Sequence, residues 1–432
     1  MSNKQKDTMK KTLENRTLVP RLRFPEFRGT GVWKERALSD VLIEHGNKST
    51  GVEEVFSVSV HKGLVNQIEH LGRSFSALST DHYNRVLPGD VVYTKSPTGE
   101  FPLGVIKQSK LDVAVIVSPL YGIFSPETSA LGALLDAYFE SPENAYIYLE
   151  PLVQKGAKNT ININNKKFLS GSLILPIEEA EQKKIADCLA SLDKLIALEG
   201  QKLVAYKTHK KGLMQLVFPV EGEALPRLRF PEFRDKSEWD EKPLSELAKR
   251  CTQKNGQVKS TRVLTNSAEF GVVDQRDFFD KNIANQSNLE GYFVVEKGDY
   301  VYNPRISITA PVGPISKNNI AQGVMSPLYT VFRFNNIQND FYAFYFKATG
   351  WHQYMRQTSS TGARHDRIAI SNGDFMAMPL PVVNPMEQQK IVDCLLSLDE
   401  LITAQTQKLA ALKIYKKGLM QQLFPVPDEV QH

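Results

Sequence analysis

Apolar residues recur at alternating spacings of four and three along two stretches of 39 residues, 181–219 and 387–425. This spacing places one apolar stripe along a helix, as the a and d positions do in a coiled coil. At about 1.5 Å per residue, each helix is expected to be roughly 55 to 60 Å long, more than one small domain needs for its own core. We therefore predict two long helices that act as spacers as well as packing elements. The stripe positions are Ile185, Leu189, Leu192, Ile196, Leu203, Tyr206, Leu213 and Val217, and then Ile391, Leu395, Leu398, Ile402, Leu409, Leu412, Leu419 and Leu423.

The two helical stretches are copies of one another, because 25 of their 39 positions are identical at a constant offset of 206 residues. A shorter repeat, PRLRFPEFR, opens the segments 20–29 and 226–235 at the same offset, and Trp33 matches Trp239. We refer to 20–29 and 226–235 as the lead-in segments. The prolines around RLRF favour extended backbone. The chain is therefore a duplication, and we expect each lead-in to be a structural clasp in preference to a phosphate contact.

Between each lead-in and its helix the two halves diverge strongly, and only landmarks recur. Gly89-Asp90 corresponds to Gly298-Asp299, each at a turn that enters a short apolar strand. Residues 134–149 and 341–355 are aromatic, helix-like segments. These patterns predict an α+β fold with two similar domains and two long antiparallel coiled-coil helices, related by a pseudo-twofold internal repeat. The expected order is a polar tail (1–19), a first domain with its lead-in (20–177), a central helix (178–219), a second domain with its lead-in (220–383), and a C-terminal helix and tail (384–432).

Two positions of the apolar stripe are polar in each copy, Glu199 and Lys210 and then Gln405 and Lys416. If the helices pair so that facing residue numbers sum to 615, Glu199 meets Lys416 and Lys210 meets Gln405. A shift by one heptad leaves a half-buried charge unpaired, which costs a few kcal/mol. We therefore predict the 615 register. The alternative is that both lysines extend to solvent and set no register.

Composition adds little to this picture. The chain has 53 Lys and Arg against 48 Asp and Glu, a net charge of +5 that permits a polyanionic partner without demanding one. Three cysteines are too few for a disulfide framework, so we expect reduced thiols and a cytoplasmic location. The apolar runs are far shorter than the roughly 18 residues of a membrane span, so we expect no membrane partner.

No motif for catalysis is convincing in this sequence. His45-Gly46-Asn47-Lys48-Ser49-Thr50 lacks the earlier glycine of a phosphate-binding loop. HExxH and CxxC spacings are absent, so we expect no metal site. Asn303-Pro304-Arg305 begins like the loop of amino-methyltransferases but lacks the second proline and the stacking aromatic. These motifs therefore give no support for an enzyme or for a cofactor bound to this chain.

Basic and amide side chains occupy turn-rich stretches at corresponding places of the two halves. Lys and Arg neutralise phosphates, Arg binds guanine in a bidentate manner and Asn binds adenine in the major groove. For any one of these residues alone, a solvated loop is the favoured interpretation. The recurrence of a basic residue after Gly-Ala in both halves raises Lys158 and Arg364 above that baseline. The candidate DNA contacts are Lys95, Ser96, Thr98, Lys155, Lys158, Asn159, Thr160, Asn162, Arg305, Ser307, Thr361, Arg364, His365 and Arg367.

The Glu-Gln pairs 181–182 and 387–388, the paired helices with their KKGLMQ-x-x-FP endings, and a Gly-Asp strand in each half together resemble the specificity subunit of a Type I restriction-modification system. The resemblance covers nearly the whole chain. It implies two target-recognition domains that each bind one half of a bipartite site in double-stranded DNA, with the helix pair fixing the spacer between the halves.

The same resemblance implies that the chemistry lies on other chains. Two methylation subunits would bring S-adenosylmethionine, and restriction subunits would bring ATP and Mg²⁺. The outward faces of the long helices would dock the methylation subunits, although a merely solvated face competes with this interpretation. The candidate docking residues are Glu181, Gln182, Lys202, Lys207, Lys211, Glu387, Gln388, Lys408, Lys413 and Lys417.

Two other functions remain open at this stage. One is a two-domain adaptor whose helices scaffold proteins and whose domains bind peptides or glycans, which the recurring aromatic residues would suit. The other is a self-contained nuclease or methyltransferase, which requires activity of the isolated chain with Mg²⁺ or a methyl donor. Binding of duplex DNA that weakens steeply with salt separates the first hypothesis from the adaptor.

Overall fold

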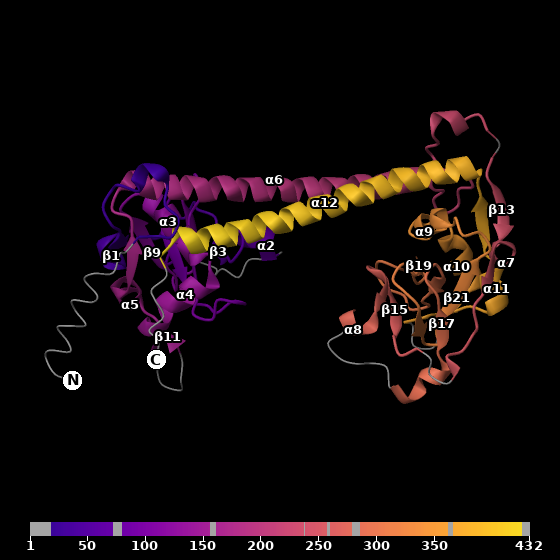
Figure 1. The fold of residues 1–432 in the computed structure, drawn as a ribbon. Coiled ribbons are helices and arrows are strands. Elements are labelled where there is room, and N and C mark those ends of the chain that lie inside the picture. The colour runs from indigo at the N-terminus through magenta and orange to yellow at the C-terminus, as the bar shows by residue number, and fades with distance from the viewer. Residues whose placement is uncertain are drawn as a thin grey trace. The chain divides into compact units, whose positions relative to one another are not determined.

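The computed structural model describes residues 19–71, 80–155, 161–236, 238–256, 260–278, 286–361 and 366–425. The chain forms two compact units (Figure 1). Unit 1 comprises residues 1–200 and 407–432, and unit 2 comprises residues 201–406. Each unit therefore combines one α+β domain with parts of both long helices, α6 (Glu179–Val217) and α12 (Pro385–Leu423).

Unit 1 is built on an antiparallel four-stranded sheet of order β2-β9-β6-β7, which consists of β2 (Leu42–Glu44), β9 (Gly122–Pro126), β6 (Val91–Thr94) and β7 (Val105–Gln108). Antiparallel two-stranded pairs surround it: β1 (Lys34–Ala37) with β12 (Ser172–Leu175), β3 (Phe56–Ser59) with β4 (Gly63–Asn66), β5 (Asn84–Val86) with β8 (Val115–Val117), and β10 (Gln154–Lys155) with β11 (Ile161–Asn162). The short helices are α2 (Gln67–Leu71), α3 (Ser129–Phe139), α4 (Pro142–Leu149) and α5 (Asn165–Ser170).

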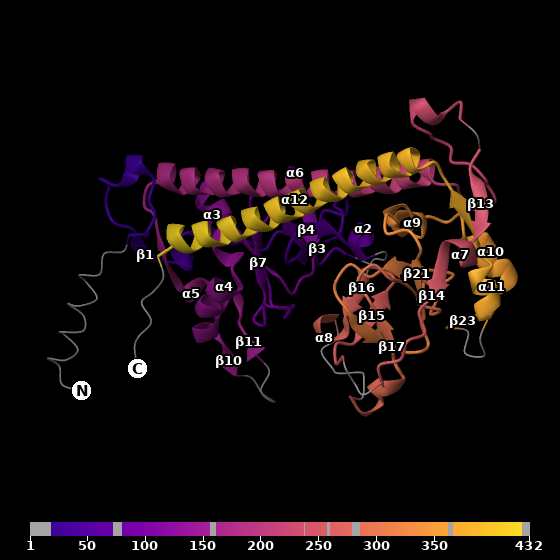
Figure 2. The same ribbon diagram turned by 45° about the vertical axis from the view of Figure 1, so that its right-hand side comes forward.

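Unit 2 repeats this topology with a sheet of order β14-β21-β18-β19, which consists of β14 (Ala248–Arg250), β21 (Thr330–Phe334), β18 (Tyr300–Tyr302) and β19 (Ile315–Lys317). The matching pairs are β13 (Asp240–Pro243) with β24 (Pro379–Val382), β15 (Leu264–Ser267) with β16 (Gly271–Asp274), β17 (Phe293–Val295) with β20 (Gly323–Met325), and β22 (Ser360–Thr361) with β23 (Ile368–Ala369). Its short helices are α7 (Leu244–Leu247), α8 (Gln275–Phe278), α9 (Asp340–Tyr345), α10 (His352–Thr358) and α11 (Asn372–Met376), several of which are labelled in Figure 2. The predicted α+β duplication is confirmed.

The expected helix-like segment 134–149 is two helices in the structure. Helix α3 ends at Phe139, and Ser141 caps the start of α4 by accepting a hydrogen bond from the backbone N–H of Asn144. Pro142 occupies the first turn of α4, where its missing N–H has no helical partner to lose. A serine followed by proline therefore starts a new helix in the middle of an otherwise continuous apolar pattern.

Each long helix contributes one of its ends to the core of unit 1 and the other end to the core of unit 2. In unit 1, Ile185 and Leu189 from the first turns of α6 pack in one cluster with Leu423 and Phe424 at the end of α12. In unit 2, the end of α6 and the start of α12 contribute in the same way, through Val217, Phe218, Ile391, Val392 and Leu395. Each fully buried side chain of this size stabilises the folded state by about 1.5–3 kcal/mol. The domains and the helices are therefore joined by shared cores.

The helices pair antiparallel, but the predicted 615 register is wrong. In unit 1, Lys416 lies 2.5 Å from Asp193 and Lys408 lies 2.5 Å from Glu199. In unit 2, Lys210 forms an ion pair with Asp399. The paired residue numbers sum to 607–609, about one heptad below 615. Lys416 also donates to a second carboxylate, that of Glu140 at 2.5 Å. Because Glu140 lies in the α+β domain of unit 1, the pattern of the two helices alone could not predict this contact.

Candidate nucleic-acid interface and partner-docking grooves

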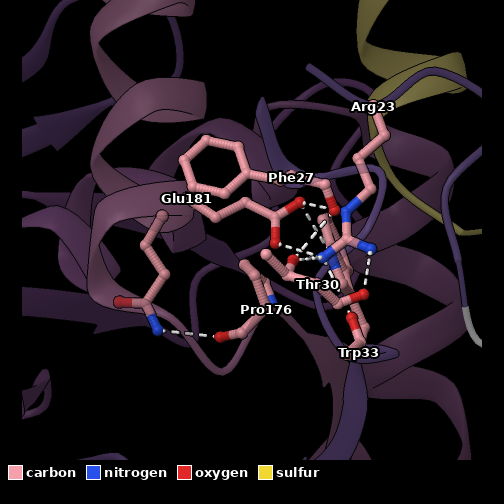
Figure 3. A network of polar contacts seen from close by, with 8 residues as sticks. Arg23, Phe27, Thr30, Trp33, Pro176 and Glu181 are labelled. Atoms are coloured by element: carbon pink, nitrogen blue, oxygen red, sulfur yellow. Dashed lines mark hydrogen bonds and ion pairs between the residues drawn. The ribbon is translucent and has the colours of Figure 1, made fainter. Parts of the chain in front are cut away.

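Each lead-in segment is held by one buried glutamate at the start of a long helix. In unit 1, Arg23 donates to both oxygens of Glu181, each at 2.7 Å, and Trp33 Nε1 donates to the same carboxylate at 3.1 Å. Arg23 also donates to Thr30 Oγ1 at 2.9 Å and to the carbonyl of Gly31 at 3.0 Å, as Figure 3 shows in part. Arg23 is 8% exposed and Glu181 is 1% exposed, so a charge pair and its hydrogen bonds are buried together.

Unit 2 contains the same arrangement at the offset of 206 residues. Arg229 donates to the two oxygens of Glu387 at 2.8 and 2.7 Å, and Trp239 Nε1 donates to Glu387 at 3.3 Å. The hydrogen bonds to these carboxylates raise the pKa of both Arg23 and Arg229. Both lead-ins are therefore structural clasps, as predicted, and their second arginines, Arg23 and Arg229, are committed to glutamates.

Four of the predicted docking residues do not lie on an outward face, so that expectation is wrong for them. Glu181 and Glu387 hold the clasps. Gln182 and Gln388 instead donate side-chain hydrogen bonds to the carbonyls of Pro176 and Val383, each at 2.9 Å. At the start of a helix the chain folds back on itself, and polar side chains can satisfy these backbone groups. The six predicted lysines are exposed, namely Lys202, Lys207, Lys211, Lys408, Lys413 and Lys417.

Most of these lysines border two grooves that are copies of one another. Groove 1, in unit 1, has a volume of about 1040 Å³, and groove 2, in unit 2, has a volume of about 360 Å³. The equivalent lining residues are Lys413 and Lys207, Lys416 and Lys210, Lys417 and Lys211, Met420 and Met214, Gln421 and Gln215, Phe424 and Phe218, Pro425 and Pro219, and Ile196 and Ile402. The duplication has therefore produced two apolar depressions rimmed by lysine.

The two grooves differ in charge. In groove 1, Lys416 is neutralised by Asp193 and Glu140. In groove 2, Lys210 is likewise paired with Asp399. The lining of groove 2 has four lysines and no acidic side chain among the described residues, whereas the lining of groove 1 has six lysines and Arg21 together with five acidic residues. Lys347 and Lys210 lie over the same Phe344 ring, at 5.6 and 5.1 Å from its centre, and burial together with Lys210 lowers the pKa of Lys347. Groove 2 is therefore the more strongly cationic of the two.

The Gly-Asp landmark forms a turn that positions the central strand of each sheet. Gly89 and Gly298 adopt φ values of +85° and +96°, which favour glycine. The buried carboxylate of Asp90 accepts hydrogen bonds from the Leu87 backbone N–H at 2.7 Å and from His45 at 2.8 Å. In unit 2, Asp299 accepts from the Glu296 backbone N–H at 2.8 Å and from Arg333.

A loop with one shared frame follows the central strand in each unit and carries several predicted DNA contacts. We refer to 95–104 as loop 1 and to 303–314 as loop 2. In each loop two backbone hydrogen bonds close a tight turn, between Thr98 and Phe101 in loop 1 and between Ser307 and Ala310 in loop 2. Near its end each loop has a glycine, Gly104 or Gly313, with φ of +108° and +80°.

These two glycines are required by a close backbone approach that the sequence analysis missed. A Cβ atom at Gly104 would lie 2.1 Å from the Thr94 carbonyl oxygen, and one at Gly313 would lie 2.2 Å from that of Asn303. The signal was present, because Pro-x-Gly recurs at Pro102–Gly104 and Pro311–Gly313. The two loops are therefore the same device with different side chains.

In loop 1, Ser96 and Thr98 lie in the turn, and the Ser96 backbone N–H donates to Thr94 Oγ1 at 3.3 Å. Burial lowers the pKa of Lys95, and the negative charge of Glu44 opposes that shift.

In unit 2, loop 2 meets the segment that carries Arg367. The backbone N–H of Ile306 donates to the Asp366 carbonyl at 3.0 Å, and that of Ile368 donates to the Pro304 carbonyl at 2.9 Å. Arg305 and Arg367 are partners in an isolated antiparallel β-bridge between the two segments. The structure thus brings together two predicted contact stretches that lie about 60 residues apart in the sequence.

The side chains of the remaining predicted contacts are outside the parts that the structure describes. Lys158, Asn159, Thr160, Arg364 and His365 are outside the described residues. For Lys155, Asn162 and Thr361 the backbone is described, in β10, β11 and β22.

Within the described ranges, no helix is both long and apolar enough to cross a membrane. The same ranges contain no cluster of three or more His, Cys, Asp or Glu that is placed to hold a metal ion.

The model of the family described as "Type I restriction modification DNA specificity domain" matches residues 136–205 and 236–413, which together exceed half of the chain. Two solved structures resemble the fold. The S subunit of a Type I restriction-modification system from M. genitalium has 12% identity and a TM-score of 0.50, over 95% of this chain and 100% of that chain. A chain from a structure of complex assembly and conformational transition of the type I R-M system has 15% identity and a TM-score of 0.50, over 91% and 97% of the two chains.

Proposed function

This chain belongs to the family of Type I restriction modification DNA specificity domains, and from that premise we propose that its two domains each bind one half of a bipartite, asymmetric DNA site. In this proposal the helix pair sets the spacer between the half-sites. The chain itself is non-catalytic and confers sequence specificity on a DNA methyltransferase and restriction complex.

The pair of equivalent loops is the observation that carries this proposal. Loop 1 and loop 2 have one backbone frame, with a tight turn and an obligatory glycine, on the same edge of the same sheet topology. Their side chains differ, with the half-buried Lys95 and the exposed Ser96 and Thr98 in one, and the exposed Arg305, Ser307 and Thr309 in the other. A shared frame with different side chains suits two readers of unlike sequences, because base edges discriminate by the donors and acceptors presented to them.

A salt titration of duplex binding tests DNA recognition. Each phosphate that the protein neutralises contributes about −0.9 to the slope of log affinity against log salt concentration. We expect the full chain to lose affinity steeply between 50 and 200 mM salt. Lys95→Ala or Arg305→Ala reduces the slope by about one if the residue contacts a phosphate, or relaxes one base preference if it contacts a base. A flat titration favours the protein-scaffolding adaptor instead.

We further propose that grooves 1 and 2 dock two methylation subunits, to which restriction subunits bind in turn. S-adenosylmethionine, ATP and Mg²⁺ bind to those partner subunits in this scheme. The apolar floor and lysine rim of each groove suit an apolar side chain flanked by carboxylates. Because groove 2 has the greater excess of positive charge, we expect one of two outcomes. Either the partner surface in groove 2 is more acidic than that in groove 1, or the same partner surface binds groove 2 more tightly at low salt.

Charge reversal in the two grooves tests this docking. Lys347→Glu reverses a charge in groove 2 at a position where groove 1 has Ser141, and Lys413→Glu reverses the charge of a lysine in groove 1, where acidic residues already lie nearby. We expect Lys347→Glu to weaken binding of the methylation subunit more than Lys413→Glu does, and to reduce the salt dependence of that binding. If the two variants weaken binding equally, or if neither weakens it, the grooves are not two docking sites of unequal charge.

A further inference from the structure

The tip of loop 2 presents an isoleucine that has no packing role in the described structure. Ile308 is 102% exposed, more than any other large apolar side chain among the described residues. Its neighbours at the turn, Ser307 and Thr309, have hydroxyl groups within 3.2 Å of each other. An isolated exposed apolar residue is ordinary on a protein surface. The way the loop is held makes this residue different.

Loop 2 is anchored along its whole length, so Ile308 is presented in a fixed position. At its base, Asn303 donates through Nδ2 to the Asn266 carbonyl at 2.9 Å, and its Oδ1 accepts from the Arg305 backbone N–H at 3.0 Å. On its return side, Ala310 and Val312 are buried in the core. The backbone bonds to Asp366 and Ile368 secure the other edge. The entropic cost of ordering this tip has therefore been met in the free protein.

The chemistry around Ile308 suits the major groove of DNA. Arg305 and Arg367 are partners in an isolated antiparallel β-bridge, three residues before Ile308 in loop 2, and the major groove is wide enough to admit paired extended segments. Among the groups that base pairs display there, the thymine C5-methyl is the apolar one, and aliphatic side chains recognise it by contact. Resting on the proposed function, we infer that Ile308 contacts the C5-methyl group of a thymine in the half-site bound by unit 2.

The corresponding tip of loop 1 cannot make this contact. Gly99 occupies the position equivalent to Ile308 and has φ of +53°, a backbone conformation that β-branched residues rarely adopt. Glu100 follows it where Thr309 lies in loop 2. The inferred methyl contact therefore belongs to one half-site only, which supplies an internal control.

Replacement of single thymines by deoxyuridine, which lacks only the methyl group, tests the inference with the full chain. The recognised site is first obtained from adenine methylation in cells that carry this chain. Binding of the duplex is then measured for each substitution with the wild type and with Ile308→Ala. We expect the wild type to lose about fourfold in affinity at one thymine, the factor that corresponds to roughly 0.8 kcal/mol for a buried methyl-sized group. Ile308→Ala should bind the thymine and deoxyuridine duplexes equally.

Ile337 provides the matched control, because it is an isoleucine in the same unit that is 91% exposed and lies outside loop 2. Ile337→Ala should keep the wild-type sensitivity to deoxyuridine, and Ile308→Val should retain part of it. The inference is overturned if the half-site of unit 2 contains no thymine, if no deoxyuridine substitution matters, or if Ile308→Ala leaves the sensitivity intact. It is also overturned if Ile308→Ala weakens binding of a protein partner and not of DNA. If the wild type shows no salt-dependent binding of duplex DNA, the proposed function itself is refuted.

Discussion

Two buried glutamates, Glu181 and Glu387, each hold an arginine that lies 158 residues earlier in the chain. The fork of the guanidinium matches the two carboxylate oxygens, and a tryptophan N–H uses the remaining acceptor capacity. A buried ion pair of this kind adds little net stability compared with apolar residues, but removal of one partner leaves a buried charge. The clasps therefore act mainly to specify how each lead-in joins its helix.

Glu181→Gln should destabilise unit 1, because Arg23 then stays buried without a counter-charge. The expected loss is about 3–5 kcal/mol. Peptide-resolved hydrogen exchange, which reports each unit separately, measures it. The double variant Arg23→Leu/Glu181→Leu should be less destabilised than Glu181→Gln, and the reverse order would contradict the assignment of this pair.

His352 makes the stability of unit 2 depend on pH. Burial, helped by the positive charge of Arg356 and opposed by Glu221, lowers the pKa of His352 to about 4. In the unfolded chain the pKa of histidine is about 6.5, so between roughly pH 6.5 and 4 the unfolded state takes up a proton that the folded state does not. Stability is therefore full above pH 6.5 and falls as the pH decreases through this range.

Comparison of the wild type with His352→Gln isolates this effect from the titration of carboxylates. The urea midpoint of unit 2 should fall more steeply between pH 7 and pH 5 in the wild type than in His352→Gln. Parallel curves for the two proteins would show that His352 does not contribute.

At the scale of elements, the long helices are fixed by what anchors their ends. The apolar stripe predicted both helices, their length and their antiparallel pairing, but several registers satisfy a heptad pattern. The burial of Ile185, Leu189, Leu423 and Phe424 in one domain core selects the observed register, and the lysines then pair with Asp193 and Asp399, which are not stripe residues. The pattern of stripe positions alone could not identify these partners.

Lys416→Glu separates the two registers. It places a third carboxylate beside Asp193 and Glu140 and should destabilise unit 1 by roughly 1–3 kcal/mol, between the values for exposed and buried pairs. Addition of Asp193→Lys should restore part of the loss, whereas addition of Glu199→Lys should not. Rescue by Glu199→Lys alone, measured by urea unfolding, would favour the 615 register.

The elements of the candidate site were partly predictable. Loop 2 and the Arg367 segment were each indicated by composition, but their pairing depends on backbone hydrogen bonds between residues distant in sequence. Ile308 carried no signal, because one isoleucine in a polar loop resembles any exposed apolar residue. Glu181 and Gln182 were assigned to an outward face because the resemblance implies that the long helices dock the methylation subunits. Their burial depends on Arg23 and on the Pro176 carbonyl.

At the scale of the whole molecule, we propose that the length of the helix pair sets the spacer between the two half-sites. A seven-residue insertion in each long helix lengthens the pair by about 10 Å, which corresponds to roughly three base pairs at 3.4 Å each. The preferred spacer between half-sites should grow by that amount, as measured by binding to duplexes of graded spacer length. An unchanged preference would mean that the helices do not set the spacer.

The most direct test of the central claim is selection of bound duplexes from a randomised pool, followed by sequencing, for the wild type and two loop variants. Lys95→Ala/Thr98→Ala alters loop 1, and Arg305→Ala/Ser307→Ala makes the matched change in loop 2. We predict that each variant changes base preference in one half of the recognised site, and that the two variants affect opposite halves. A variant that changes both halves, or two variants that change the same half, would contradict two domains that each recognise one half-site.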